Sequence, residues 1–227
     1  MAAVIAGGSW FFLRSAPANA KRIAVLPFDN LSSDASQNYF SEGIAEELRS
    51  ALGHIGLQVI GRASSDAVKD LDTKVIASKL GVANILTGSV RRASAMVRIS
   101  AQLVGGTDGV QRWEETYDRA AGDEIKIQTD IAANVAQSLS IALGQAGKAA
   151  LVLGGTTDSS AQDLYLRAAA LYRNDTGEAA VREAAKLLDA ATARDPNYAN
   201  AFRMKANFLE YLTTSYSKSA DEMTRGK

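Results

Sequence analysis

Residues 21–52 read KRIAVLPFDNLSSDASQNYFSEGIAEELRSAL, and this stretch decides the fold. Its opening apolar run, residues 23–28, carries no charge and is long enough for one buried strand but too short for a helix. Pro27 has no backbone N–H to donate to a neighbouring strand, so we expect the strand to end there. After a polar turn at residues 29–34, apolar side chains recur three or four apart over residues 38–52, which predicts an amphipathic helix. The stretch therefore opens a strand-helix-strand unit.

The composition is that of a folded protein with balanced charge. Of its 227 residues, 47% are hydrophobic, which is enough for one large or two small buried cores. The 25 basic and 25 acidic side chains cancel, so no strong overall field attracts nucleic acid or anionic lipid. The absence of cysteine excludes disulfides and thiolate metal sites.

The next segments extend the first strand into the parallel half of a sheet. Residues 57–60 predict a second strand, parallel to the first because a helix connects the two. Residues 64–70 and 73–80 predict two short helices, and Gly81 ends the second of them.

Three antiparallel strands form the other half, and the sequence predicts them at residues 84–91, 95–104 and 110–117. Polar and apolar residues alternate in the middle strand, so one face is buried and the other is wet. Both connections have hairpin length. A long helix at residues 123–143 closes the domain. The predicted fold class is therefore α/β (α+β), with a five-stranded mixed sheet covered by helices.

The opening stretch also resembles a known family. Residues 23–34 match I-A-V-L-P-F-x-N-x-S-x-D and residues 39–48 read Y-F-S-E-G-I-A-E-E-L, similar to the start of the domain related to the amino-terminal domain of TolB. The resemblance covers residues 21–145. It implies a domain found beside adenylate cyclase modules and in membrane-anchored, winged-helix regulators resembling CadC, usually ahead of tetratricopeptide repeats. The resemblance therefore implies a domain with a signalling or scaffolding role, and it assigns no catalytic residue to this chain.

Residues 1–20 lie outside the predicted fold. Residues 2–13 read AAVIAGGSWFFL, an apolar run that is followed by Arg14. The aromatic end and the basic residue resemble the exit of a transmembrane helix, although the run is shorter than the roughly 20 residues of a spanning helix. A signal peptide cut after Ala20 is the alternative, although no basic residue precedes the apolar run. We expect the end of a transmembrane helix that begins upstream of Met1 and attaches the protein to the membrane.

The second half of the chain has a helical pattern. Residues 146–160 are predicted as a linker from their glycine, serine and threonine content, and residues 161–227 as an all-α segment. Ala184, Leu188 and Ala191 match the second helix of a tetratricopeptide repeat, whose period is about 34 residues. One complete repeat and part of another cannot bury a core alone, since about three are needed. We therefore expect a partial tetratricopeptide array that docks on the first domain.

The sequence offers little chemistry. His54 is the only histidine, so a metal site or a catalytic relay would have to be built around it alone. One interpretation places a basic strip on the open face of the sheet. This strip consists of Arg91, Arg92, Arg98 and Arg112. It lacks the stacking aromatics of a nucleic-acid site. We predict no catalytic residue, no cofactor, no metal and no bound nucleic acid, and we do not expect an enzyme.

The candidate partner-binding residues are Asn200, Arg203 and Asn207. Their three- and four-residue spacing places them on one face of a helix, the inward face of the last repeat's first helix. In tetratricopeptide proteins such donors often hold the terminal carboxylate or the backbone of a peptide. The alternative interpretation is a solvated helix face.

Together these patterns predict a non-catalytic sensory or protein-interaction module of a membrane-anchored bacterial signalling or transcription-regulatory protein. Its globular part would face the periplasm from an inner-membrane anchor and would bind a protein or peptide through the helical repeats, with self-association as a second mode. The alternative is a cytoplasmic scaffold or regulatory region associated with an adenylate cyclase.

Overall fold

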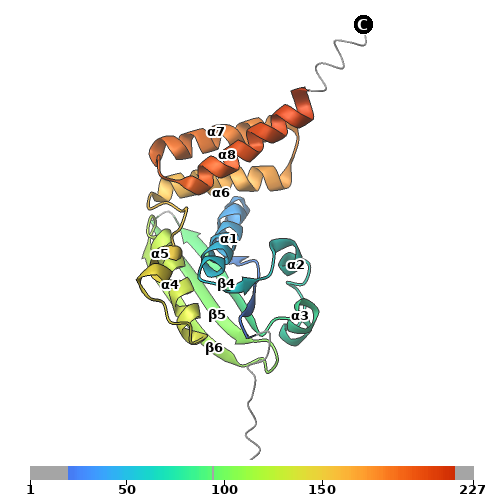
Figure 1. Cartoon of the computed structure of the whole chain (residues 1–227), viewed down its shortest axis with the longest axis vertical. Helices are drawn as coiled ribbons and strands as arrows, with labels where there is room; N and C mark the ends of the chain where they lie inside the picture. The colour runs from blue at the N-terminus through green and yellow to red at the C-terminus, as the bar shows by residue number, and fades with distance from the viewer. Residues whose placement is uncertain (1–19, 94, 218–227) are drawn as a thin grey trace, which may run out of the picture.

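The computed structural model describes residues 20–93 and 95–217, and it has a mixed α/β body below a helical segment (Figure 1). The strands are β1 (Arg22–Val25), β2 (Asp29–Asn30), β3 (Gln58–Val59), β4 (Asn84–Ala93), β5 (Met96–Gly105) and β6 (Gln111–Ala120). The helices of the body are α1 (Asn38–His54), preceded by the short η1 (Ala35–Gln37), α2 (Arg62–Asp66), α3 (Thr73–Leu80) and α4 (Glu124–Ser138). The short α5 (Gln145–Ala150) leads to the helical segment, which consists of α6 (Ser159–Asn174), α7 (Glu178–Arg194), α8 (Ala199–Leu212) and the π-helical turn η2 (Thr213–Ser217).

The six strands form one mixed sheet in the order β3-β1-β4-β5-β6, with β2 pairing on β4. Strand β1 pairs parallel with both β3 and β4, as expected for strands joined by helices. Strands β4, β5 and β6 pair antiparallel through short connections. The predicted fold class, a mixed sheet covered by helices, is confirmed.

The sequence prediction was wrong about β2, which it assigned to a polar turn. Residues 29–30 pair in parallel with residues 89–90. Pro27 cannot donate to the ladder, but the chain keeps its direction, and the Leu31 amide still donates to the Val90 carbonyl (2.8 Å). The strand is therefore interrupted at Pro27 and then resumes.

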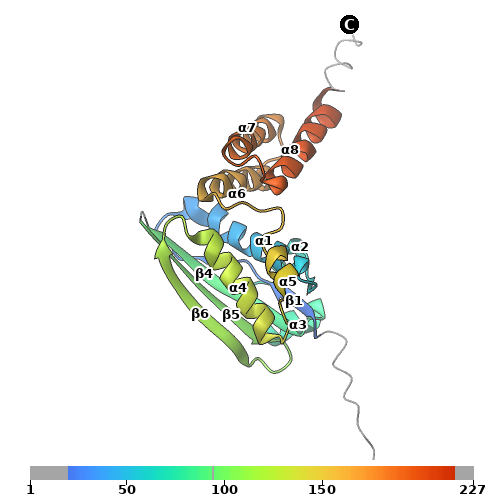
Figure 2. The same cartoon turned by 60° about the vertical axis from the view of Figure 1, so that its left-hand side comes forward.

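Helices α1 and α4 pack side by side on one face of the sheet (Figure 2). They share with the strands a core that includes Ile44, Leu48, Ile99 and Ile131. On the opposite face, α2 and α3 lie over the parallel strands above a smaller core. The antiparallel strands keep a polar open side there, where the Ser100 and Thr116 hydroxyls bond to each other (2.9 Å). The alternation predicted for β5 therefore separates the core from solvent.

Helix α4 is shorter than predicted, because it ends at Ser138 rather than at residue 143. Ser140 has a φ of 56°, in the left-handed region. The Ser140 amide donates to the Gln137 carbonyl (2.9 Å) and the Ile141 amide donates to the Ala136 carbonyl (2.8 Å). These two bonds form a Schellman motif, which glycine usually closes, so a serine at this position gave no stop signal.

The helical segment breaks twice, at residues 175–177 between α6 and α7 and at residues 195–198 before α8. Helix α7 packs against both α6 and α8. Small side chains lie in the contacts, and Ala168, Ala184, Ala191 and Ala201 are fully buried. Such residues let helices approach closely. The assignment to the tetratricopeptide class stays a prediction, as do the domain boundaries at residues 20, 145 and 160.

The predicted leader falls outside the described residues, except for Ala20. Among residues 20–93 and 95–217, no helix is long and apolar enough to cross a membrane.

Candidate functional site

Helix α1 connects the body to the helical segment. Its inner face carries Ile44, Leu48 and Leu52, which are fully buried against the sheet and α4. Its outer face lies under α6, and a Cβ added at Gly43 would come within 2.7 Å of both Leu166 methyl groups. Glycine at this position therefore lets α6 lie directly on α1.

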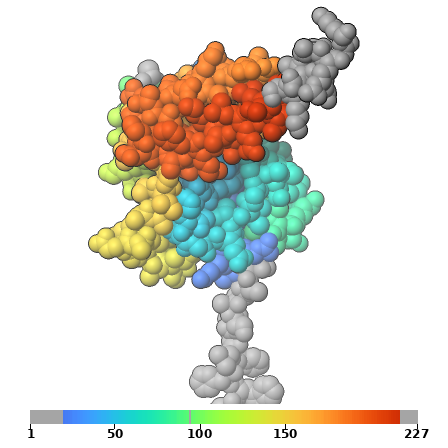
Figure 3. Space-filling model, turned by 45° about the horizontal axis from the view of Figure 1, so that its top comes forward, coloured from blue at the N-terminus to red at the C-terminus, as the bar shows by residue number. Residues whose placement is uncertain are grey.

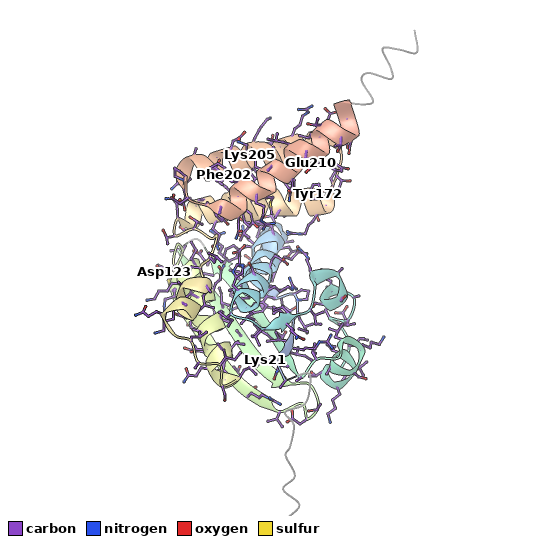
Figure 4. All side chains as sticks on the ribbon, in the orientation of Figure 1. Lys21, Asp123, Tyr172, Phe202, Lys205 and Glu210 are labelled. Atoms are coloured by element: carbon purple, nitrogen blue, oxygen red, sulfur yellow. The ribbon has the colours of Figure 1, made fainter. Side chains whose placement is uncertain are left out.

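A groove opens beside this contact, between α1, α6 and α8, with a volume of about 420 Å³. We call it the arginine groove. Apolar and aromatic residues of α6 and α8 line it, namely Tyr165, Leu166, Ala169, Tyr172, Met204 and Phe208. Tyr172 lies between α6 and α8 (Figure 4), and its ring packs on Phe208 with 4.7 Å between ring centres. Figure 3 shows the seam between the helical segment, in orange to red, and the body beneath it.

Charged groups complete the lining, namely Glu46, Arg62, Arg173 and Arg203. The Arg62 and Arg173 Nη2 atoms both donate to the same Glu42 carboxylate oxygen, at 2.9 and 3.0 Å. Burial lowers the pKa of Arg173, and the nearby charge of Arg62 lowers it further. Two guanidinium groups are thus held close together by one carboxylate.

The structure brings two of the three predicted partner-binding residues to this groove. Arg203 and Asn207 line it, and Arg203 makes no hydrogen bond or ion pair with any other described residue. Asn200, one turn earlier on α8, lines a separate small hollow beside Gln128 and the loop that contains Gly155. Their role in binding stays a prediction.

Sequence reasoning missed Arg62, Arg173 and Glu42. They belong to α2, α6 and α1, and only the packing of these helices brings them together. Their spacing along the chain carries no signal of this contact. The Tyr-Phe-Ser-Glu-Gly motif did contain Glu42, but nothing in it indicated the side chain's partners.

Glu47 lies under the helical segment and is half-buried. Burial raises its pKa to about 7, with a further rise from Glu46 and an opposing effect from Arg203. Burial also raises the pKa of Tyr165 and Tyr198, and the Glu47 charge raises both further. The buried Tyr198 hydroxyl has no hydrogen-bond partner among the described residues. This part of the contact is polar and incompletely paired.

A second polar contact, the Asp163 cluster, holds the other side of α6. The Tyr39 hydroxyl donates to an Asp163 carboxylate oxygen (2.6 Å), and Arg92 from β4 donates to the same oxygen (3.1 Å). Arg167 pairs with the second oxygen (2.8 Å). The Arg92 guanidinium also stacks over the Phe40 ring at 4.6 Å. Asp163 therefore joins the helical segment to a strand and a helix of the body.

This cluster overturns the predicted basic strip. Arg92 points to the helix-covered face of the sheet, because it lies an even number of residues from the buried Val90. Arg98 is neutralised by Asp118, with 2.6 Å between the charged atoms, and Arg112 lies 3.9 Å from Asp108. Arg91 is exposed and lies opposite Arg98 in the β4–β5 register, so the open face carries Arg91 beside two paired arginines and not a strip of four.

The described residues contain no group of three or more histidine, cysteine, aspartate or glutamate side chains that could hold a metal ion. His54, at the end of α1, lies on the exposed side. The arginine groove combines an apolar floor with three arginines and one carboxylate, Glu46, which pairs with Arg49 at 2.8 Å.

No family model matches the chain. A search of curated proteins finds "Putative adenylate cyclase 3" of Rhizobium meliloti, 40% identical over 148 residues that make up 64% of this chain. The chain spans about a quarter of that relative's length (25%).

Solved structures with a similar arrangement are more distant. Lipoprotein GNA1162 from Neisseria meningitidis is 16% identical, with a TM-score of 0.40 over 55% of this chain and 99% of that one. TolB from Acinetobacter baumannii is 15% identical, with a TM-score of 0.41 over 52% of this chain and 28% of that one. The LpoB C-terminal domain from Salmonella enterica is 17% identical, with a TM-score of 0.35 over 46% of this chain and 86% of that one.

Proposed function

We propose that this chain is a non-catalytic interaction module of a longer signalling protein, and that the arginine groove binds an acidic-ended peptide of a partner. The observation that carries the proposal is the composition of the groove. It has aromatic and aliphatic walls with an exposed arginine, Arg203, which forms no hydrogen bond or ion pair with a described residue, although its charge lowers the pKa of Glu47. Apolar area supplies affinity, and a guanidinium supplies directed donors for a carboxylate.

The similarity to a putative adenylate cyclase supports one setting for this module. Of the two settings predicted from the sequence, regulation beside a nucleotide cyclase is the one that a relative's name favours. We propose that partner binding at the groove shifts how the helical segment sits on the body, and that the attached output region responds to this shift.

The test of peptide binding uses hexapeptides with a fluorescent amino terminus, an aromatic residue and a free acidic carboxyl terminus. We expect saturable binding by fluorescence anisotropy, and at least about tenfold weaker binding by the Arg203→Ala variant, because a charge-assisted hydrogen bond is lost. Arg182→Ala is the matched control, since Arg182 lies on α7, pairs with Glu178 and does not line the groove. Equal affinity of wild type and Arg203→Ala would remove the proposal.

The apolar leader supports the other setting predicted from the sequence, in which an inner-membrane anchor places the described part in the periplasm. The sequence of residues 2–13 is its basis. Reporter fusions after residue 217, one active only in the periplasm and one fluorescent only in the cytoplasm, test it in the full-length protein. A cytoplasmic signal would overturn this location and leave the cyclase-associated scaffold.

A further inference from the structure

Arg62 and Arg173 both bind Glu42, although one arginine would be enough to neutralise this carboxylate. Both guanidinium groups line the arginine groove, whereas Glu42, the carboxylate between them, does not. Glu42, whose side chain is 37% exposed, holds both guanidinium groups through one oxygen and so orients them. About a quarter of each arginine side chain stays exposed, 26% for Arg62 and 23% for Arg173.

The donors of this pair are largely unused. An arginine side chain has five N–H groups in a fixed fork. Among the described residues, Arg173 donates only to Glu42, and Arg62 donates only to Glu42 and Asp66. Holding two like charges together costs free energy unless anions surround them. Burial lowers the pKa of Arg173 and the charge of Arg62 lowers it further, whereas Asp66 and Glu42 raise the pKa of Arg62.

We propose that Arg62 and Arg173 form an anion-binding subsite of the arginine groove, oriented by Glu42, which takes an anionic side chain of the bound peptide. The inference rests on the proposed function: Arg203 on α8 receives the terminal carboxylate, and the Arg62–Arg173 pair receives a second anionic group further along the peptide. The group is a carboxylate or a phosphate, since both match the guanidinium fork. The ligand class is therefore a peptide with two anionic groups and an aromatic or aliphatic residue between them.

The subsite also links binding to the docking of the helical segment. Arg173 belongs to α6, whereas Arg62 and Glu42 belong to the body. An anion that bridges the two arginines adds a contact between the two parts. Peptide binding thus tightens the contact between α6 and the body, and this gives the module a structural response.

The experiment measures the affinity of a peptide series for the intact chain. In hexapeptides with a free carboxyl terminus, a single glutamate is moved through the inner positions, and each peptide has a glutamine counterpart. We expect one position at which glutamate binds about tenfold tighter than glutamine, and a preference below about twofold in Arg173→Lys and Arg62→Lys, which keep the charge but lose the fork. The Arg182→Ala control keeps the full preference.

The outcomes separate the two proposals. A glutamate preference that survives both lysine variants overturns the subsite, even if Arg203→Ala weakens binding and the proposed function stands. An absence of binding by the wild type overturns both. Replacing the preferred glutamate by phosphoserine then identifies the anionic group that the subsite takes. Tighter binding that the lysine variants abolish identifies a phosphate. Equal or weaker binding identifies a carboxylate.

Limited proteolysis provides a second readout of the same subsite. The predicted linker, residues 146–160, joins the body to α6, and protease access there reports docking. We expect the preferred peptide to slow cleavage of the wild type and to leave the Arg173→Lys rate unchanged. Equal protection of both proteins would contradict the bridging role.

Discussion

The two faces of α1 are held in different ways. The inner face is mostly apolar, with Ile44, Leu48 and Leu52 fully removed from water, and the buried Arg49 beside it donates to the Val25 carbonyl. The outer face meets the helical segment through the close apolar contact of Gly43 with Leu166 and, on either side of it, through the polar groups of Tyr39, Glu42 and Glu47.

This difference indicates that the contacts of the inner face persist in the folded protein, whereas a partner can replace the polar contacts of the outer face. Apolar burial is non-directional and is lost only on unfolding. Polar contacts at a half-exposed interface can be exchanged, since water or a ligand can replace their partners. The inner face therefore holds the body together, and the outer face is suited to a contact that a partner modifies.

Of the substitutions considered, one on the inner face of α1 should lower the free energy of unfolding most. Leu48→Ala removes a fully buried side chain from the main core and leaves a cavity. We expect a loss of about 3 kcal/mol in the free energy of unfolding, measured by urea denaturation. A loss below about 1 kcal/mol would show that the core relaxes around this site and would weaken the comparison.

A substitution in the Asp163 cluster should have a smaller effect, limited to the contact between α6 and the body. Asp163→Ala leaves Arg92, Arg167 and the Tyr39 hydroxyl without their shared acceptor. We expect the contact to weaken by about 2 kcal/mol, seen as faster protease cleavage at residues 146–160 while the circular dichroism of the body is retained. Arg182→Ala serves as the control, and an unchanged cleavage rate would mean that the apolar contact at Gly43 holds α6 without help.

The raised pKa of Glu47 predicts that the free energy of unfolding depends on pH. Its pKa of about 7 lies above the ordinary value of 4.5, so the folded protein binds a proton more tightly than the unfolded chain. The protonated Glu47 therefore makes its full contribution to the free energy of unfolding below pH 4.5, and this contribution is lost as the pH rises toward 7.

We expect Glu47→Gln to remove this slope and to raise the free energy of unfolding at pH 8 by about 1 kcal/mol relative to wild type, because the group is only half-buried. Urea denaturation at pH 5 and pH 8 provides the measurement. Identical slopes for the two proteins would assign the pH dependence to other groups.

The open face of the sheet should show the smallest effect. Arg98 and Asp118 pair across β5 and β6 at exposed positions. Arg98→Ala should leave the free energy of unfolding in urea denaturation unchanged within experimental error, because water screens an exposed ion pair. It should also leave peptide binding unchanged, and a loss of binding would move the partner site from α1 to the sheet.

The body could be predicted well from the sequence because each element carries a local pattern. The apolar run before Pro27, the alternation in β5 and the glycine after α3 each follow from neighbouring residues alone. The end of α4 was missed because Ser140 adopts a conformation that glycine usually supplies.

The candidate site could be predicted only in part. Arg203 and Asn207 share a helix face, so their spacing was visible. Arg62 and Arg173 are far apart in the sequence and meet only because Gly43 lets α6 lie on α1. The basic strip failed because Arg92 alternates to the helix-covered face, where Asp163 binds it.

Chemical-shift mapping tests the central claim, that the outer face of α1 and the arginine groove form the partner interface. Isotope-labelled wild type is titrated with the acidic-ended hexapeptide used for anisotropy. The account predicts saturable shifts of the amides of Gly43, Ala169 and Asn207, and little change on β5 and β6. Shifts confined to the open face of the sheet, with the groove amides unmoved, would contradict it.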